Sequence, residues 1–168
     1  VTGAFACYGT NAMDNNAKAV LERNLVNKLM TNAFWSLRGN LQGVFTACTQ
    51  RYERQGYFYD EHIFSQTACY FADMSGFLSK FIKDVRENQA ANGRYSVYAP
   101  YANFSYIDPP AGEDPGLEVG GLIFPWRMYQ NYADTRILRE HYNSATNWLN
   151  YATNHFRNYY WANFSNPT

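Results

Sequence analysis

Apolar residues recur every three or four positions along several stretches of the chain, a spacing typical of amphipathic helices. The first such stretch begins at Ala17, and we expect it to end at Gly39 or Gly43, because glycine often terminates helices. The apolar face of this predicted helix is formed by Val26, Leu29, Met30, Ala33, Phe34 and Leu37.

The same spacing predicts two further helices, at residues 60–73 and 77–90. The expected inner face of the first is formed by Ile63, Phe64, Thr67 and Phe71, with Met74 just beyond its end. The expected inner face of the second is formed by Phe77, Leu78, Phe81, Ile82 and Val85. On its outer face, Lys80 with Asp84 and Lys83 with Glu87 stand four residues apart, as weak helical ion pairs do.

The segment 92–121 contains four of the six prolines and shows no helical spacing, so we predict a long irregular loop. Helices are expected again at 122–132 and 135–141, the latter capped by Asp134, and at 144–156, with Trp148, Leu149 and Ala152 inward. Residues 1–12 are interpreted as the end of an upstream domain or a linker. The sequence therefore predicts an all-α domain over residues 13–168.

Helical hairpins in series fit an (α/α)6 toroid, in which six hairpins close into a ring. Such a ring needs about twelve helices of ten to fifteen residues each, which is more than this chain of 168 residues provides. We therefore expect about the N-terminal half of the barrel here. We also expect this half-barrel to pack against the remainder of the barrel and against upstream domains in a longer parent chain.

The amino-acid composition limits the kinds of ligand that this chain is expected to bind. Fifteen tyrosines and four tryptophans offer flat apolar faces with a polar edge, which suit sugar rings or an aromatic core. The net charge is zero with no basic stripe, which argues against nucleic acid, and no apolar run is long enough to cross a membrane. Three scattered histidines, three cysteines without CxxC spacing and no phosphate-binding glycine loop predict no metal or cofactor.

The segment 50–60, QRYERQGYFYD, carries the most informative cluster of polar residues. Glu53 lies between Arg51 and Arg54 among tyrosines, and Asp60 follows seven residues later. Carboxylates set among aromatic rings suit glycoside chemistry, in which one carboxyl group must keep its proton near neutral pH to act as an acid. A charged surface loop is the plainer interpretation of this spacing alone.

Further motifs stand in order around this segment: SLRGN at 36–40, the aromatic helices, and LIFPWRMYQNYAD at 122–134. Together they resemble the catalytic barrel of the bacterial and fungal alpha-L-rhamnosidases, glycoside hydrolase family seventy-eight, over about Phe5 to Tyr151. The resemblance implies removal of terminal alpha-L-rhamnose or a related sugar from glycans or glycosides. It also implies an inverting mechanism, with a general acid and a general base.

By this resemblance Glu53 is the general acid that protonates the leaving oxygen. The general base lies in the second half of the family's barrel, and no residue of this chain is assigned to it. Arg51 and Arg54 are expected to orient carboxylates through paired hydrogen bonds. Tyr57 stands where the family's motif has a tryptophan. Substrate contacts are implied for Asp60, Arg51, Arg54, Tyr57 and Trp126.

The chain departs from the family pattern at several polar positions. The family's aspartates are replaced by Ala47, Tyr52 and Val119, its tryptophan in the later segment by Leu117, and the glycine before the closing aspartate by Tyr59. Lost hydroxyl contacts change or abolish turnover. Two alternatives therefore stand: a non-catalytic carbohydrate-binding or structural barrel, and a lyase acting on a rhamnosyl-uronate polysaccharide through tyrosines and arginines.

The expected location is extracellular or periplasmic, with the cytoplasm left open. Asn103 and Asn163 begin sequons that would carry glycans in a secreted eukaryotic protein, but such triplets often arise by chance.

Overall fold

The computed structural model describes residues 15–49, 53–101, 115–157 and 160–161. The described part is helical, as predicted, apart from a two-residue antiparallel pairing of β1 (Phe156–Arg157) with β2 (Tyr160–Trp161). The predicted upstream segment 1–12 lies outside the described residues. The helices are α1 (Asn15–Asn40), α2 (Phe58–Phe71), α3 (Ser75–Glu87), α4 (Pro115–Glu118), α5 (Gly120–Tyr132) and α6 (Thr135–His155).

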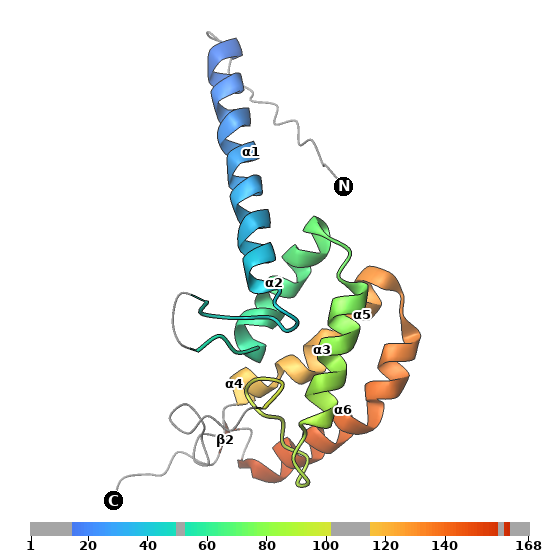
Figure 1. Ribbon diagram of the computed structural model, residues 1–168. Coiled ribbons are helices and arrows are strands. Elements are labelled where there is room, and N and C mark those ends of the chain that lie inside the picture. The colour runs from blue at the N-terminus through green and yellow to red at the C-terminus, as the bar shows by residue number, and fades with distance from the viewer. Residues whose placement is uncertain (1–14, 50–52, 102–114, 158–159, 162–168) are drawn as a thin grey trace, which may run out of the picture.

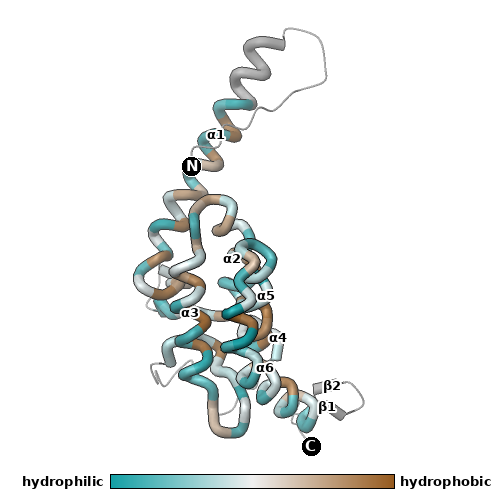
Figure 2. The backbone as a smooth tube through the Cα atoms, turned by 90° about the vertical axis from the view of Figure 1, so that its right-hand side faces the viewer, coloured by the Kyte–Doolittle hydropathy of each residue, from teal (hydrophilic) through white to brown (hydrophobic). Residues whose placement is uncertain are grey.

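The body of the molecule is formed by α2, α3, α5 and α6, with α5 in contact with each of the other three (Figure 1). Helix α1 leaves this body and projects outward, and only its last turns lie against the other elements (Figures 1 and 2). On α1 the apolar side chains of Leu25, Leu29 and Trp35 are exposed, and on the body Ile63 of α2 and Trp126 of α5 are exposed as well. This arrangement is a partial (α/α)6 toroid, as the sequence predicts.

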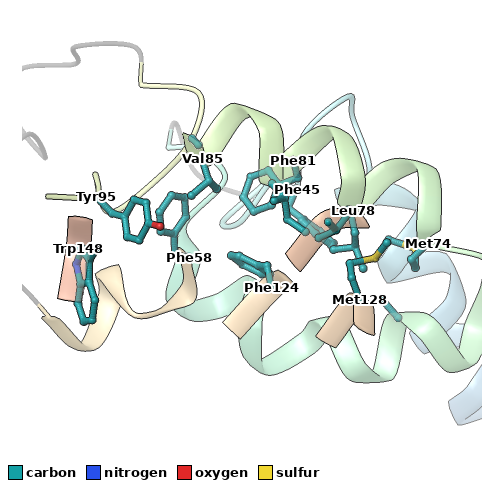
Figure 3. Close-up of a cluster of buried hydrophobic side chains, with 14 of the residues drawn as sticks. Phe45, Phe58, Met74, Leu78, Phe81, Val85, Tyr95, Phe124, Met128 and Trp148 are labelled. Atoms are coloured by element: carbon teal, nitrogen blue, oxygen red, sulfur yellow. The ribbon is translucent and has the colours of Figure 1, made fainter. Parts of the chain in front are cut away.

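Aromatic rings from three helices, α2, α3 and α5, and from the segment between α1 and α2 meet in the centre of the core (Figure 3). The ring of Phe81 on α3 packs edge-to-face against Phe45 at 5.4 Å, Phe58 at 6.0 Å and Phe124 at 5.1 Å. Such contacts add about 0.5–1.5 kcal/mol each beyond the area they bury. Because Phe45 belongs to the segment between α1 and α2, this cluster anchors that segment to the helical body.

Two glycines allow the start of α5 to approach its neighbours. A Cβ atom on Gly120 would lie 2.6 Å from Cβ of Phe58, and one on Gly121 would lie 2.5 Å from the ring of Tyr95. Either distance is shorter than a real Cβ contact. Close packing of α5 against Phe58 and Tyr95 therefore explains this glycine pair.

A buried polar network holds the segment after α3, and the end of α4, against α6. Nε of Arg94 and Nε1 of Trp148 each donate to the fully buried carboxylate of Glu118, at 2.9 Å. The hydroxyl of Tyr95 lies 2.9 Å from both Nε2 of His141 and Oγ of Ser144. Burial lowers the pKa of His141 to about 4. These bonds satisfy polar groups that would be costly to bury alone.

Several local predictions are confirmed. The expected inner face of the third helix is the face that α3 turns to the core, with Leu78, Phe81, Ile82 and Val85 buried. Both ion pairs on its outer face form, Lys80 with Asp84 and Lys83 with Glu87. The carboxylate of Asp134 accepts from the backbone N–H groups of Arg136 and Ile137, as a helix cap does.

The predicted inner face of the helix at 60–73 is confirmed only in part, because Met74 is buried and Phe64 and Phe71 pack against the core, but Ile63 and Thr67 do not. Helix α2 begins two residues earlier and buries Phe58, Glu61, Ser65 and Ala68, whereas Ile63 is 58% exposed and Thr67 is exposed. These four buried residues stand three or four positions apart, so they share one face of the helix. Helix α2 also contacts α5, where the ring of Phe58 packs edge-to-face against that of Phe124 at 6.0 Å.

Three further expectations are corrected. The two helices predicted after Asp134 are one, α6, and Leu149 on it is 49% exposed instead of inward. The irregular region ends earlier than predicted, because α4 and the first turn of α5 occupy its last residues. On α1, Leu29 is 65% exposed, since this part of the helix projects from the body, while Leu37 is buried as expected.

Candidate functional site

Of the QRYERQGYFYD segment, residues 53–57 lie in the loop between α1 and α2, and residues 58–60 form the first turn of α2. At the base of this loop the backbone N–H of Ala47 donates to the carbonyl of Gln55 at 3.0 Å. Cys48 and Arg54, just inside this closure, have φ angles of 53° and 51°, in the left-handed region that side-chain-bearing residues rarely adopt. Strained backbone of this kind is concentrated at functional sites, which marks the loop as a candidate.

The second half of the loop is fixed to the segment before Pro100. Ala99 donates its backbone N–H to the carbonyl of Gly56 at 3.1 Å, and Phe58 donates to the carbonyl of Val97 at 3.0 Å. A Cβ atom on Gly56 would lie 2.6 Å from the carbonyl oxygen of Ala99, so glycine is needed for this approach. The loop therefore enters α2 from a fixed position.

The predicted site residues occupy different environments in this loop. Glu53 is half-buried and Arg54 is exposed. Tyr57 is half-buried, and its ring packs edge-to-face against that of Tyr98 at 5.6 Å. Arg51 lies outside the described residues. The roles assigned to these four side chains stay predictions.

A pocket of about 270 Å³ lies where the end of α1, the loop and the start of α2 meet. Asp60, one of the predicted substrate contacts, lines this pocket and is otherwise exposed. The apolar part of the lining comes from Leu37, Phe45, Ala47 and Phe64. The polar part comes from Ser36, Asn40, Cys48, Asp60 and Glu61.

Glu61 is the residue of this pocket that the sequence did not single out. Its side chain is only 5% exposed, although glutamate is rarely buried. Burial, and then the neighbouring charge of Asp60, raise the pKa of Glu61 from 4.5 to about 8. An Asp-Glu pair at a helix start is ordinarily interpreted as two exposed acids beside the helix dipole, so no signal in the sequence distinguishes this one.

Trp126 lies apart from this constellation. It is on α5, 51% exposed, with its ring 5.5 Å from that of Tyr129. It is not among the residues that line the pocket. Its role as a substrate contact stays a prediction.

Within the described residues no group of three or more His, Cys, Asp or Glu side chains is placed to hold a metal ion. None of the described helices is long and apolar enough to span a membrane.

Comparison with known proteins supplies the wider context of this site. Residues 18–167 match the family model described as the bacterial alpha-L-rhamnosidase six-hairpin glycosidase domain. Among curated proteins, the chain is 32% identical to an alpha-L-rhamnosidase of Alteromonas sp., over 79% of this chain and 14% of the relative. It is 33% identical to one of Streptomyces avermitilis, over 78% of this chain and 12% of the relative.

Solved structures give the same result. The fold is similar to that of an alpha-L-rhamnosidase from Streptomyces avermitilis complexed with L-rhamnose, with a TM-score of 0.71 and 32% identity over 79% of this chain. It is also similar to one from Dictyoglumus thermophilum, with a TM-score of 0.69 and 31% identity over 78% of this chain. The chain covers 12% and 14% of these two structures, respectively, so it corresponds to part of a much longer protein.

Proposed function

Because the chain belongs to the bacterial alpha-L-rhamnosidase six-hairpin glycosidase domain family, we propose that the parent protein is a glycoside hydrolase that removes terminal alpha-L-rhamnose from glycans or glycosides. The observation that carries this proposal is the match over residues 18–167, which includes the whole loop and the pocket beside it. A structural relative with the same fold was solved with L-rhamnose, which supports the choice of sugar.

In the proposed mechanism Glu53 is the general acid. It protonates the glycosidic oxygen as the bond to the sugar breaks, while a second carboxylate activates water from the opposite face of the ring. In inverting enzymes the two carboxyl groups stand about 6.5–9.5 Å apart, which leaves room for that water. The base would come from the part of the barrel outside this chain. Asp60 binds hydroxyls of the sugar, and Arg51 and Arg54 orient the carboxylates.

One observation favours a second candidate, a barrel that binds carbohydrate without cleaving it. Ala47, which stands where the family carries an aspartate, is buried in the pocket wall next to Cys48. Its methyl group makes no hydrogen bond to a sugar. A site that has lost such a contact binds or turns over its substrate more weakly.

The experiment that separates these candidates is product analysis of the full-length parent with a rhamnosylated glycan in H₂¹⁸O. Release of rhamnose with the heavy oxygen at C1 supports hydrolysis. Cleavage without label, giving an unsaturated product, supports elimination by a lyase. Binding without cleavage supports the non-catalytic barrel.

The role of Glu53 is tested by Glu53→Gln in the parent protein. An acid matters most when the leaving group is poor, so kcat/KM should fall by roughly 10²–10⁴ on alkyl or glycosyl rhamnosides and far less on an activated aryl rhamnoside. Glu87→Gln is the matched control, because Glu87 is exposed on α3 and pairs with Lys83. Equal losses on both substrates would remove the acid role from Glu53.

A further inference from the structure

The side chain of Glu61 is almost completely buried, with 5% of its surface exposed. Among the described residues its carboxyl group has no hydrogen bond or ion pair, so the small exposed part of the side chain lies at the pocket. A buried polar group without a partner costs about 1–3 kcal/mol. Packing alone would favour an apolar residue at this position of α2, between Phe58 and Phe64.

Glu61 lines a space that a ligand can occupy. Glu61 lines the 270 Å³ pocket together with Asp60, Ser36 and Asn40. Nδ2 of Asn40 donates one N–H within α1, to the carbonyl of Ser36 at 2.7 Å, which leaves its second N–H and its amide oxygen for other partners. The pocket thus combines polar groups that can still form hydrogen bonds with apolar walls formed by Leu37 and Phe45.

We propose that Glu61 is a specificity-determining residue that hydrogen-bonds a hydroxyl group of the sugar bound in the pocket between α1 and α2. This inference rests on the proposed function for the identity of the sugar. The volume is close to the lower end of small-molecule sites, about 300 Å³, and so suits a single sugar ring.

A neutral hydroxyl suits this carboxyl group better than a cation does. The raised pKa of Glu61, about 8, keeps it protonated at neutral pH, so that it offers one donor and one acceptor. A sugar hydroxyl needs this combination. A cation would need an ionised carboxylate, which the burial of Glu61 disfavours.

The test is calorimetric binding of L-rhamnose and its mono-deoxy derivatives to the full-length parent protein. Glu61→Leu should weaken L-rhamnose binding by about 10-fold to 100-fold, because the bound hydroxyl loses its partner. The derivative that lacks this hydroxyl should bind the wild type and Glu61→Leu equally. Glu61→Gln keeps a donor and an acceptor and should retain most of the affinity, and Glu87→Gln should change nothing.

Stability gives an independent readout. If Glu61 serves ligand binding, Glu61→Leu should unfold at the same or a higher temperature than the wild type, because it removes an unpaired buried polar group. Three results would overturn the inference: equal losses for every derivative together with a lower melting temperature, unchanged binding by Glu61→Leu, or no sugar binding by the wild type. Sugar binding with the expected pattern but without hydrolysis would support it, and would remove only the proposed hydrolase activity.

Discussion

Replacing Glu61 by glutamine should make the stability of this chain much less dependent on pH. In the folded state burial and the charge of Asp60 raise the pKa of Glu61 to about 8, whereas the ordinary value in an unfolded chain is 4.5. Between these two values the folded chain holds a proton that the unfolded chain has released. Each rise in pH across this interval therefore favours unfolding.

The magnitude follows from the two pKa values. The stabilising contribution is fully present below pH 4.5 and is lost as the pH rises to about 8. At about 1.4 kcal/mol per pH unit, the complete loss amounts to about 5 kcal/mol, and about 3 kcal/mol of it has occurred by pH 7. Because Glu61 is only 5% exposed, little of this effect should be screened by solvent. Glutamine has nearly the same shape and stays uncharged, so its variant escapes the loss.

The assay is urea unfolding of wild type and Glu61→Gln from pH 4 to pH 9, followed by far-UV circular dichroism and tryptophan fluorescence. The difference between the two free energies of unfolding isolates Glu61 from other titrating groups, which are common to both proteins. This difference should be small near pH 4, grow in favour of the variant through pH 7 and become constant above pH 8.

Parallel curves across the whole pH range would refute the reasoning. They would show that Glu61 has the same pKa in the folded and unfolded chain. In that case its carboxylate is ionised in the folded protein, and the argument for a proton-bearing group in the pocket fails with it.

Two other substitutions test the core. Burial lowers the pKa of His141 from 6.5 to about 4, so between these pH values the unfolded chain binds a proton that the folded chain does not. The wild type should therefore lose about 3 kcal/mol of stability as the pH falls across this interval. In urea unfolding, His141→Gln should reduce this loss of stability at acid pH, and an unchanged pH dependence would contradict the assignment. Gly121→Ala should cost about 1–3 kcal/mol, because its Cβ would lie 2.5 Å from the ring of Tyr95. Gly39→Ala, with no atom within 4 Å of the new Cβ, is the matched control and should be neutral or stabilising by up to about 1 kcal/mol. Equal melting temperatures for the two variants would exclude the close contact.

The spacing of apolar residues correctly predicted the buried face of a helix where only one face of that helix is buried. The buried residues of α3 are the ones that its spacing indicates, because its opposite face carries solvated ion pairs. The same argument held only in part for α2, where Phe64 and Phe71 pack against the core but Ile63 lies toward solvent and Glu61 is buried. Hydrophobicity does not predict the burial of Glu61, because this side chain lines a pocket.

The candidate site was predictable only in part. The motif indicates the loop and Asp60, and the structure places Asp60 at a pocket. Glu61 has no pattern of its own, because its burial depends on segments that pack around α2. The abundance of tyrosine was ambiguous for a similar reason: Tyr95 and Tyr98 are fully buried in the core, so these two are structural.

The pocket is lined by one continuous stretch of the sequence. All of its lining residues lie between Ser36 and Phe64, although the helical body around them is assembled from the whole described chain. Contacts this close in sequence close small loops and form early in folding. Exchanging this one segment between related proteins, while Phe45 and Phe58 are kept to anchor it in the core, would transfer all the residues that line the pocket in a single substitution of sequence.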